Sequence, residues 1–321
     1  MIEQFRIPVG DAAESFIEFL TDSLDGLFDA LRTAFLVVHD GFDWLLSTPP
    51  FWLVIAVLAL VALLLRGPWL ALGTAAGLLF IVAVDQWDNA MDTLALVIVS
   101  SATAILVGIP LGIWASGNRV VSAVMRPVLD LLQTMPAFVY LIPALMLFRV
   151  GVVPGIVATI VFAIAPAVRL TELGIRGVDR EIVEAGHAFG ASPGRILRQI
   201  QLPLAMPSIM AGVNQVIMLS LSMVVIAGLV GAGGLGGDVV QSLSSLDIAL
   251  GVEAGLSVVV LAIIIDRITS AFAGGKATEH GLLARLRRRE RPGRAPVRTP
   301  VAEAPAPAEE AEPDRERAAV P

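Results

Sequence analysis

One polar stretch near the middle of the chain carries side chains whose types and spacing could serve binding or proton transfer. Residues 184–203, EAGHAFGASPGRILRQIQLP, combine a carboxylate, a histidine and two arginines between long apolar segments. Unpaired backbone groups cost several kcal/mol each in hydrocarbon, so this segment must form a structured loop outside the membrane. In such a loop His187 suits a surface contact rather than a proton relay.

The same stretch predicts two short helices separated by a turn. The first is expected over residues 181–189 and the second over residues 196–201. Gly190 can end the first helix because glycine tolerates a left-handed backbone conformation. Pro203 is expected to limit the second helix, since proline removes a backbone donor.

Two glycine motifs do not predict a nucleotide site. Gly231, Gly233 and Gly236 satisfy G-x-G-x-x-G, but they follow an apolar run rather than a strand and lack a βαβ unit. They predict a glycine-rich external turn at which helices approach closely. The residues around Gly275-Lys276 lack the glycine and hydroxyl of a phosphate-binding loop, so the chain is not expected to hydrolyse ATP alone.

Metal and proton chemistry are disfavoured as well. The chain has no cysteine, and His39, His187 and His280 lack metal-ligand spacing. We therefore predict no catalytic residue, no metal site and no cofactor on this chain. Ionisable groups are scarce inside the apolar runs, whereas a proton-coupled carrier usually places them at mid-membrane depth.

Composition indicates an all-α polytopic membrane protein. Hydrophobic residues make up 56% of the 321 residues and charged residues 16%, whereas soluble domains carry about 25% charged residues. The net charge of −7 says little about partners, because the charges are segregated along the chain. The first fifteen residues are polar and contain no apolar signal-peptide core.

Apolar runs predict about seven transmembrane helices. They cover roughly residues 51–65, 69–84, 92–115, 128–148, 152–170, 207–230 and 249–271. A span needs about 20 apolar residues, which the last five runs supply. Internal prolines predict kinks at Pro110, Pro136, Pro143 and Pro166. The first two runs are short, so residues 49–84 form either two extra spans or a membrane-dipping hairpin.

The two ends of the chain differ from this membrane region. Residues 1–48 predict an external amphipathic segment, since apolar residues recur at helical spacing from Phe16 to Phe35 opposite an acidic face. It is expected to lie at the membrane surface as a scaffold, or to dock a partner. Residues 273–321, rich in Pro, Ala, Glu and Arg, predict a cytoplasmic, largely disordered tail. Its basic cluster suits contact with anionic lipid rather than nucleic acid.

The distribution of arginine predicts the orientation. One set of loops carries Arg66, Arg119, Arg126, Arg176, Arg180, Arg195 and Arg198. The opposite set, residues 85–91, 149–151 and 231–248, holds only Arg149 against several aspartates. The arginine-rich set is therefore expected in the cytoplasm. Seven spans then place the N-terminus outside and the C-terminus inside.

Polar and soft residues inside the apolar runs have two interpretations. They can support helix packing, where small and hydroxyl residues are common, or line a polar route for a solute. Aromatic residues among them could meet a cationic solute by cation–π attraction. The candidates for the route are Gln133, Thr134, Phe138, Tyr140, Asn214, Ser220, Ser222 and Met223.

The polar stretch resembles the cytoplasmic EAA loop of ABC importer permeases, with pattern E-A-A-x3-G-x9-I-x-L-P. The matching positions are Glu184, Ala185, Gly190, Ile200, Leu202 and Pro203. Gly186 departs from the pattern, because the family usually has alanine there. Beyond the loop, residues 85–272 are similar to the permease subunit of glycine betaine/proline betaine ABC importers, notably QTMPAFVYLIP at 133–143.

This resemblance implies a type I importer core over residues 85–272, with its EAA loop within 171–206. Two copies would form a pore in a bacterial plasma membrane. Two ATP-binding subunits would hold ATP and Mg, and an extracytoplasmic solute-binding protein would deliver solute. Glu184 would anchor the loop on the ATPase, Gly190 would permit its turn, and Leu202 and Pro203 would join it rigidly to the next helix.

The implied function is ATP-driven import of glycine betaine or proline betaine for osmoprotection. One alternative keeps an ABC permease but changes the solute to choline or methionine. The alternative from another class is an ion-coupled secondary transporter, which the scarcity of ionisable residues in the apolar runs disfavours.

Overall fold

The structure is a computed structural model that describes residues 9–272, and in this range all regular secondary structure is helical. The helices are α1 (Val9–Ser47), α2 (Phe51–Arg66), α3 (Pro68–Ala83), α4 (Trp87–Gly117), α5 (Arg119–Thr134), α6 (Ala137–Phe148), α7 (Val152–Arg176), α8 (Arg180–Ala188), α9 (Pro193–Ile196), the π-helix η2 (Leu197–Gln201), α10 (Leu202–Ser222), α11 (Val224–Gly228), α12 (Gly234–Ser245) and α13 (Ile248–Phe272). The expected tail at 273–321 lies outside the described residues.

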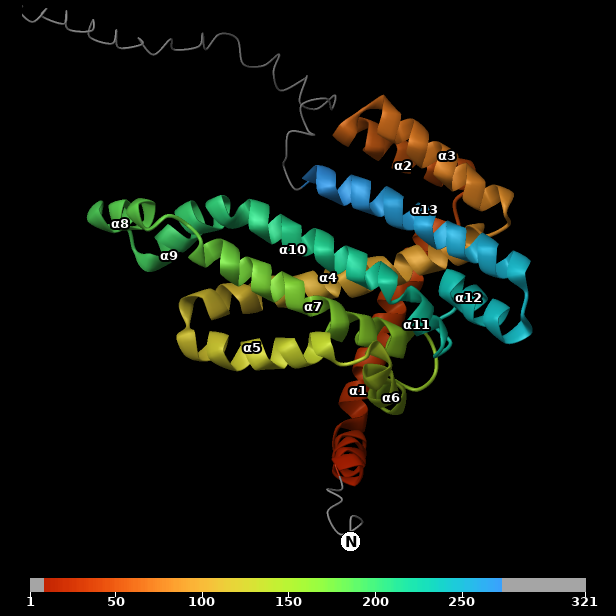
Figure 1. Cartoon of the computed structure of the whole chain (residues 1–321), viewed down its shortest axis with the longest axis horizontal. Coiled ribbons are helices and arrows are strands. Elements are labelled where there is room, and N and C mark those ends of the chain that lie inside the picture. Colours follow the sequence, from red (N-terminus) through yellow and green to blue (C-terminus); the bar gives the residue numbers. More distant parts are fainter. Residues whose placement is uncertain (1–8, 273–321) are drawn as a thin grey trace, which may run out of the picture.

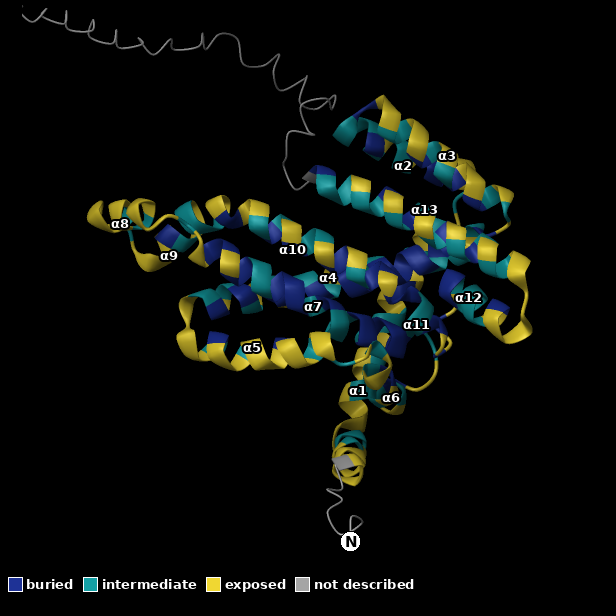
Figure 2. Cartoon of the chain, viewed as in Figure 1, coloured by how far each residue is buried: buried dark blue, intermediate teal, exposed yellow. Residues whose placement is uncertain are grey.

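Three long helices, α4, α7 and α10, lie side by side and contain most of the buried residues (Figures 1 and 2). Small residues allow this approach: a β-carbon at Gly112 would lie 2.6 Å from Thr171 Cβ, and one at Gly108 would lie 2.6 Å from Ala167 Cβ. In a membrane such contacts between small residues drive helix association, because lipid supplies no hydrophobic force.

Four helical segments are long and apolar enough to cross a membrane: 87–117, 152–176, 193–228 and 248–271. The number rises to six if each of two bent helix pairs forms one span. The all-α polytopic fold expected from composition is therefore confirmed, with four to six candidate spans in place of the seven expected.

One expected span differs from the prediction. The run at 128–148 is divided into α5 and α6, which meet at 99°. Met135, between them, has an extended backbone (φ −70°, ψ 137°). The proline that follows, Pro136, disfavours helical geometry at the preceding residue and lacks a backbone donor. The apolar sequence continues through this break, so hydropathy alone cannot find it.

The first two apolar runs form α2 and α3, which pack against each other. Each helix has 16 residues, fewer than the about 20 that a perpendicular span needs. The turn between them uses Gly67, whose φ is 98°, and Pro68 at the start of α3. Both helices also pack against α13.

The amphipathic N-terminal segment forms α1, which runs across α4, α7 and α10 rather than along them (Figure 1). It packs against α4, where Phe35 and Phe42 contact the cluster around Leu96, and against the C-terminal end of α6. Phe28 packs edge-on against Phe148 with ring centroids 5.5 Å apart, and Asp29 pairs with Arg149 at 3.3 Å. This crossing direction suits a helix that lies along a membrane surface.

Candidate functional site

The first half of the polar loop is α8, and it agrees with the predicted helix at 181–189 to within one residue at each end. Asp179 begins the helix, since its carboxylate accepts a hydrogen bond from the Glu181 backbone N–H at 2.9 Å. Gly190 ends it with φ +74°. The N–H of Gly190 donates to the His187 carbonyl and that of Ala191 to the Gly186 carbonyl. These two bonds form a Schellman motif, as the glycine predicted.

The second half of the loop shows that the predicted helix end at Pro203 is wrong. Helix α9 leads through η2 into α10, and residues 193–228 form one long helical segment. Pro203 falls in the first turn of α10. In an α-helix the proline ring would clash with the carbonyl four residues earlier. The π-helical turn of η2 immediately before α10 shifts the hydrogen-bond register there, so the chain continues through the proline.

The matched loop residues divide between an outward and an inward set. Glu184, Ala185, Gly190 and Pro203 are exposed, and α8 has no buried residue. Ile200 and Leu202 are half-buried, and Leu202 packs against Ile175, Ala205 and Ile209. The outward set is therefore free to meet another molecule, while the inward set attaches the loop to α7 and α10.

Gly186 belongs to the inward set. A β-carbon there would lie 2.8 Å from Ile200 Cδ1 and 3.4 Å from Ile196 Cγ1. The position where the sequence departs from the EAA pattern is thus the point at which α8 contacts the helix that follows the turn.

Phe189 is an exposed aromatic that the sequence analysis did not single out. It precedes Gly190 at the tip of the loop, and 91% of its surface is exposed. The exposure of Phe189 could have been predicted from its place between α8 and a glycine in a polar loop, because no apolar segment is near enough in sequence to bury it. A large exposed aromatic side chain suits an anchor in a protein interface.

The candidate route residues do not gather in one place. Gln133, Thr134 and Phe138 are exposed on either side of the break between α5 and α6. The half-buried Tyr140 donates its hydroxyl to the Leu132 carbonyl. These four residues surround a bent helix pair, where a solute route remains a prediction.

The other four candidates lie on α10 or directly after it. Ser220 is buried and donates to the Val216 carbonyl, and Met223 is buried against Leu141, Ala158 and Val230. Ser222 is exposed and donates to the Met218 carbonyl. Asn214 bonds to α13, donating to Asp266 at 3.2 Å and accepting from Thr269 at 2.7 Å. The contacts of Asn214, Ser220 and Met223 are those of helix packing.

A charged cluster between α5 and α7 escaped the sequence analysis. Glu172 is 8% exposed; it accepts from Ser122 Oγ at 2.6 Å and pairs with Arg176 at 3.0 Å and Arg126 at 3.6 Å. Beside it, Asp130 pairs with Arg169. Both members of that second pair fall inside predicted apolar runs, so ionisable residues there are less scarce than hydropathy suggested.

The glycine motif at 231–236 forms the expected close turn between α11 and α12. A β-carbon at Gly236 would lie 2.8 Å from the Val224 carbonyl carbon and nearer still to its oxygen. The Leu235 N–H donates to Thr93 Oγ1 at 2.9 Å. Nearby, the buried His39 of α1 lies 3.4 Å from the Asp92 carboxylate. The close approach of helices is confirmed, and its external position remains a prediction.

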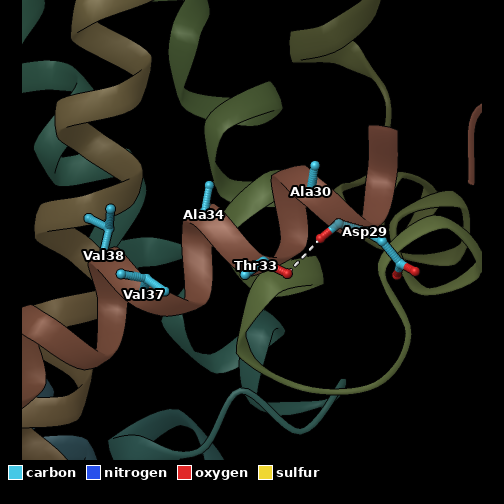
Figure 3. Close-up of a pocket in the computed structure, with 6 residues that line it drawn as sticks. All are labelled: Asp29, Ala30, Thr33, Ala34, Val37 and Val38. Atoms are coloured by element: carbon cyan, nitrogen blue, oxygen red, sulfur yellow. Dashed lines mark hydrogen bonds between the residues drawn. The ribbon is translucent and has the colours of Figure 1, made fainter. Parts of the chain in front are cut away.

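A hollow of about 710 Å³ lies along α1, and Figure 3 shows the residues that line it. It is lined by Asp29, Ala30, Thr33, Ala34, Val37 and Val38. All six come from one helix, Thr33 bonds back to the Asp29 carbonyl, and the Asp29 carboxylate is held by Arg149. A small-molecule site usually needs polar groups that converge from several elements, and this hollow does not provide them. Among residues 9–272 no three His, Cys, Asp or Glu side chains are grouped to hold a metal ion.

Comparison with known proteins places this geometry in a family. Residues 108–275 match the family described as binding-protein-dependent transport system inner membrane component. The chain is 44% identical over 264 residues to the glycine betaine transport system permease protein OpuAB of Bacillus subtilis, covering 82% of this chain and 94% of that protein. It is 44% identical over 265 residues to the glycine betaine/proline betaine transport system permease protein ProW of Escherichia coli, covering 83% and 75%.

The fold agrees with this relationship. A chain of the MetNI methionine ABC transporter in an inward-facing conformation superposes with a TM-score of 0.51, at 23% identity, over 58% of this chain and 93% of that chain. At that identity the match concerns the fold alone. The chain belongs to the family of binding-protein-dependent transport system inner membrane components.

Proposed function

We propose that this chain is the membrane-spanning permease subunit of an ATP-driven importer for glycine betaine and proline betaine. The observation that carries the proposal is the exposed EAA-type loop, with Glu184 and Gly190 on its outer surface, in a chain that is 44% identical to named betaine permeases. Choline and methionine permeases are the alternatives within the same family.

The proposal includes a full set of partners. A second copy of the chain completes the pore. Two ATP-binding subunits carry ATP and Mg and receive the outward side of the loop, including Glu184, Ala185 and Gly190. An extracytoplasmic solute-binding protein supplies the selective aromatic cage for the quaternary ammonium, since this chain has a single tyrosine.

The proposal also fixes an orientation in a bacterial plasma membrane, with the C-terminus in the cytoplasm. The N-terminus lies outside when α2, α3 and the bent pair α5–α6 each cross the membrane, which makes seven crossings with the four long segments. Two features support this orientation. The loop at 184–203, which carries two arginines, and the connection between α4 and α5 lie at the same end of the molecule, opposite the turn from α12 to α13 (Figure 1). Arg66 donates to Ser270 near the end of α13 at 3.3 Å, so another arginine lies beside the C-terminal end of that helix.

Reporter fusions test the orientation. A cytoplasmic reporter should be active after residues 118 and 190 and inactive after residues 88 and 240. An active cytoplasmic reporter after residue 240 would show that the orientation is reversed.

Reconstitution tests the function. The chain, its ATP-binding subunit and its solute-binding protein are placed in proteoliposomes, and uptake of labelled glycine betaine is measured with ATP inside. Uptake should require both ATP and the binding protein, and proline betaine should compete. Uptake driven by an ion gradient without ATP would refute the proposal, and so would transport of choline or methionine without transport of betaine.

A further inference from the structure

The polar side chains of α5 form one stripe that ends at the break before α6. Arg126, Asp130, Gln133 and Thr134 are spaced by four, three and one residues, which places them on one face of the helix. Exposed apolar side chains occupy a separate stripe, which consists of Val120, Val124, Val128 and Leu131. The helix therefore has one exposed apolar face, which suits lipid, and a separate polar face, which does not.

Helix α7 presents a matching set of charges to this stripe. Arg169, Glu172 and Arg176 are spaced by three and four residues, and together with α5 they line a groove of about 330 Å³. This volume lies near the lower end of the range for small-molecule sites, about 300–1,000 Å³. The groove therefore has room for a small solute.

The charges in the groove lie in two layers. Glu172 forms the inner layer, where Ser122, Arg126 and Arg176 satisfy its carboxylate. Arg176 also donates to the Ala115 carbonyl at 2.8 Å, which fixes it to α4. Glu172 and Arg176 thereby join three helices, while the Arg126 side chain stays 66% exposed.

Asp130 and Arg169 form the outer layer, and their side chains remain 64% and 39% exposed. Asp130 lies about 17 Å along the axis from the start of α5, at about 1.5 Å per residue. Charged side chains at such positions face water or protein rather than lipid, because hydrocarbon cannot solvate them. This face of the helix pair must therefore meet a water-filled space or another polypeptide.

We propose that the groove between α5 and α7 is a transient binding site for a small zwitterion, in which the solute exchanges with the Asp130–Arg169 ion pair. The guanidinium of Arg169 takes the carboxylate of the solute, for which its planar fork is suited. The Asp130 carboxylate takes the ammonium end. Because the zwitterion carries both charges, each residue keeps a partner throughout the exchange.

Two further properties of the groove favour this ligand class. An exposed ion pair contributes little to stability, so it can open at small cost. The groove also holds three arginines against two carboxylates, and the additional positive charge favours the carboxylate end of the solute. Gln133 and Thr134 continue the polar surface toward the α5–α6 break, so the site lies on a continuous polar path. In identifying the solute as a betaine, this inference rests on the proposed function.

The first test measures whether water and solute reach the groove. The chain has no cysteine, so Gln133→Cys introduces a single thiol in the polar stripe and Val128→Cys a matched one in the apolar stripe. In the reconstituted transporter a charged, water-soluble thiol reagent should modify residue 133 much faster than residue 128. Glycine betaine should slow modification at residue 133, whereas choline, which lacks a carboxylate, and neutral glycerol should not.

The second test measures uptake by variants of the pair. Arg169→Gln and Asp130→Asn should each lower glycine betaine uptake about tenfold, a loss of the size expected for a charge-assisted contact. Arg149→Gln is the matched control, since it breaks another exposed Arg–Asp pair, that with Asp29, and should leave uptake within about twofold of the unaltered protein. Co-purification with the ATP-binding subunit checks that each variant assembles.

The outcomes separate this inference from the proposed function. Failure of the unaltered transporter to import glycine betaine refutes the proposed function. If that transporter works, an unreactive thiol at residue 133 shows that a second copy or lipid covers the groove and overturns the inference. A reactive thiol that glycine betaine does not protect overturns it as well. So does a result in which Arg169→Gln and Asp130→Asn transport as well as Arg149→Gln.

Discussion

The two ends of the helical bundle are built differently. At the glycine turn, residues 228–236, main chains meet so closely that a β-carbon on Gly236 would approach the Val224 carbonyl group. At the polar loop, residues 184–203, α8 has no buried residue and Phe189 is 91% exposed. The first end is held by contacts within the chain, whereas the second leaves the outward side chains of its loop exposed.

This difference predicts which property a substitution changes. Close contacts between main chains cannot relax, so altering the glycine turn should affect folding. The outward side chains of the loop carry little of the fold, so altering them should affect association and leave the membrane region intact. Five substitutions test this contrast, from the largest expected effect to the smallest.

Gly236→Ala should have the largest effect, because it places a methyl group against the backbone of Val224. Overpacking costs about 1–3 kcal/mol and occasionally more. The yield of monodisperse protein and its melting temperature in detergent should both fall. Gly237→Ala is the control, since nothing lies within 4 Å of a β-carbon there. Equal melting temperatures for the two variants would contradict the close contact.

Gly190→Val should separate assembly from folding. Valine disfavours the left-handed conformation at φ +74°, which costs about 1–2 kcal/mol for a residue with a β-carbon. Glu184→Lys reverses an exposed charge on the same surface. Pull-down of the ATP-binding subunit should decrease for both variants, while insertion and dimerisation persist.

Gly194→Ala is the control for the loop, since open space surrounds that position and its φ is not positive. If Gly190→Val and Glu184→Lys keep normal ATPase binding and solute-stimulated turnover, the loop is not the coupling element.

Phe189→Ala should weaken the same association without affecting the turn. Truncating an aromatic anchor typically costs about 2 kcal/mol or more, so the dissociation constant should rise at least about tenfold. Leu243→Ala removes another exposed apolar side chain, on α12 at the opposite end, and should leave the constant unchanged. Similar values for both variants would show that Phe189 is not an anchor.

Gly186→Ala should have the smallest effect. Alanine favours a helix over glycine by about 0.8–1.0 kcal/mol, but its β-carbon would displace the flexible end of Ile200. These terms oppose each other, so the melting temperature should change little. Adding Ile200→Val removes the displaced carbon, and the double variant should be more stable than the sum of the single effects. Simple additivity would show that the two side chains do not meet.

Local signals in the sequence predicted the loop well. The helix at 181–189 and the role of Gly190 follow from a Schellman motif, whose hydrogen bonds lie within six residues. The end expected at Pro203 failed because the rule for proline assumes α-helical hydrogen bonds, whereas η2 precedes it. The kink predicted at Pro136 is a 99° break between two helices, and hydropathy gave no sign of its size because the apolar sequence continues across it.

The charged groove was missed for a different reason. Hydropathy averages a few arginines and carboxylates into long apolar runs, although their spacing was visible at 126, 130 and 133 and at 169, 172 and 176. Each set falls on one face of its helix, so the spacing alone predicts a polar face on each helix that must contact water or another polar surface. That they face each other depends on how α5 folds back beside α7, which spacing within one helix does not determine.

The π-helix η2 joins the loop to α10 without a break. A π turn holds one residue more than an α turn, whereas an extra residue in a continuous α-helix would rotate everything beyond it by about 100°. The wider turn at Leu197–Gln201 absorbs that residue, so the chain continues as one helical segment across Pro203. Deleting one of these five residues would restore α-helical hydrogen bonds and bring the Pro203 ring against the carbonyl four residues earlier, so the loop would lose its continuous joint to α10.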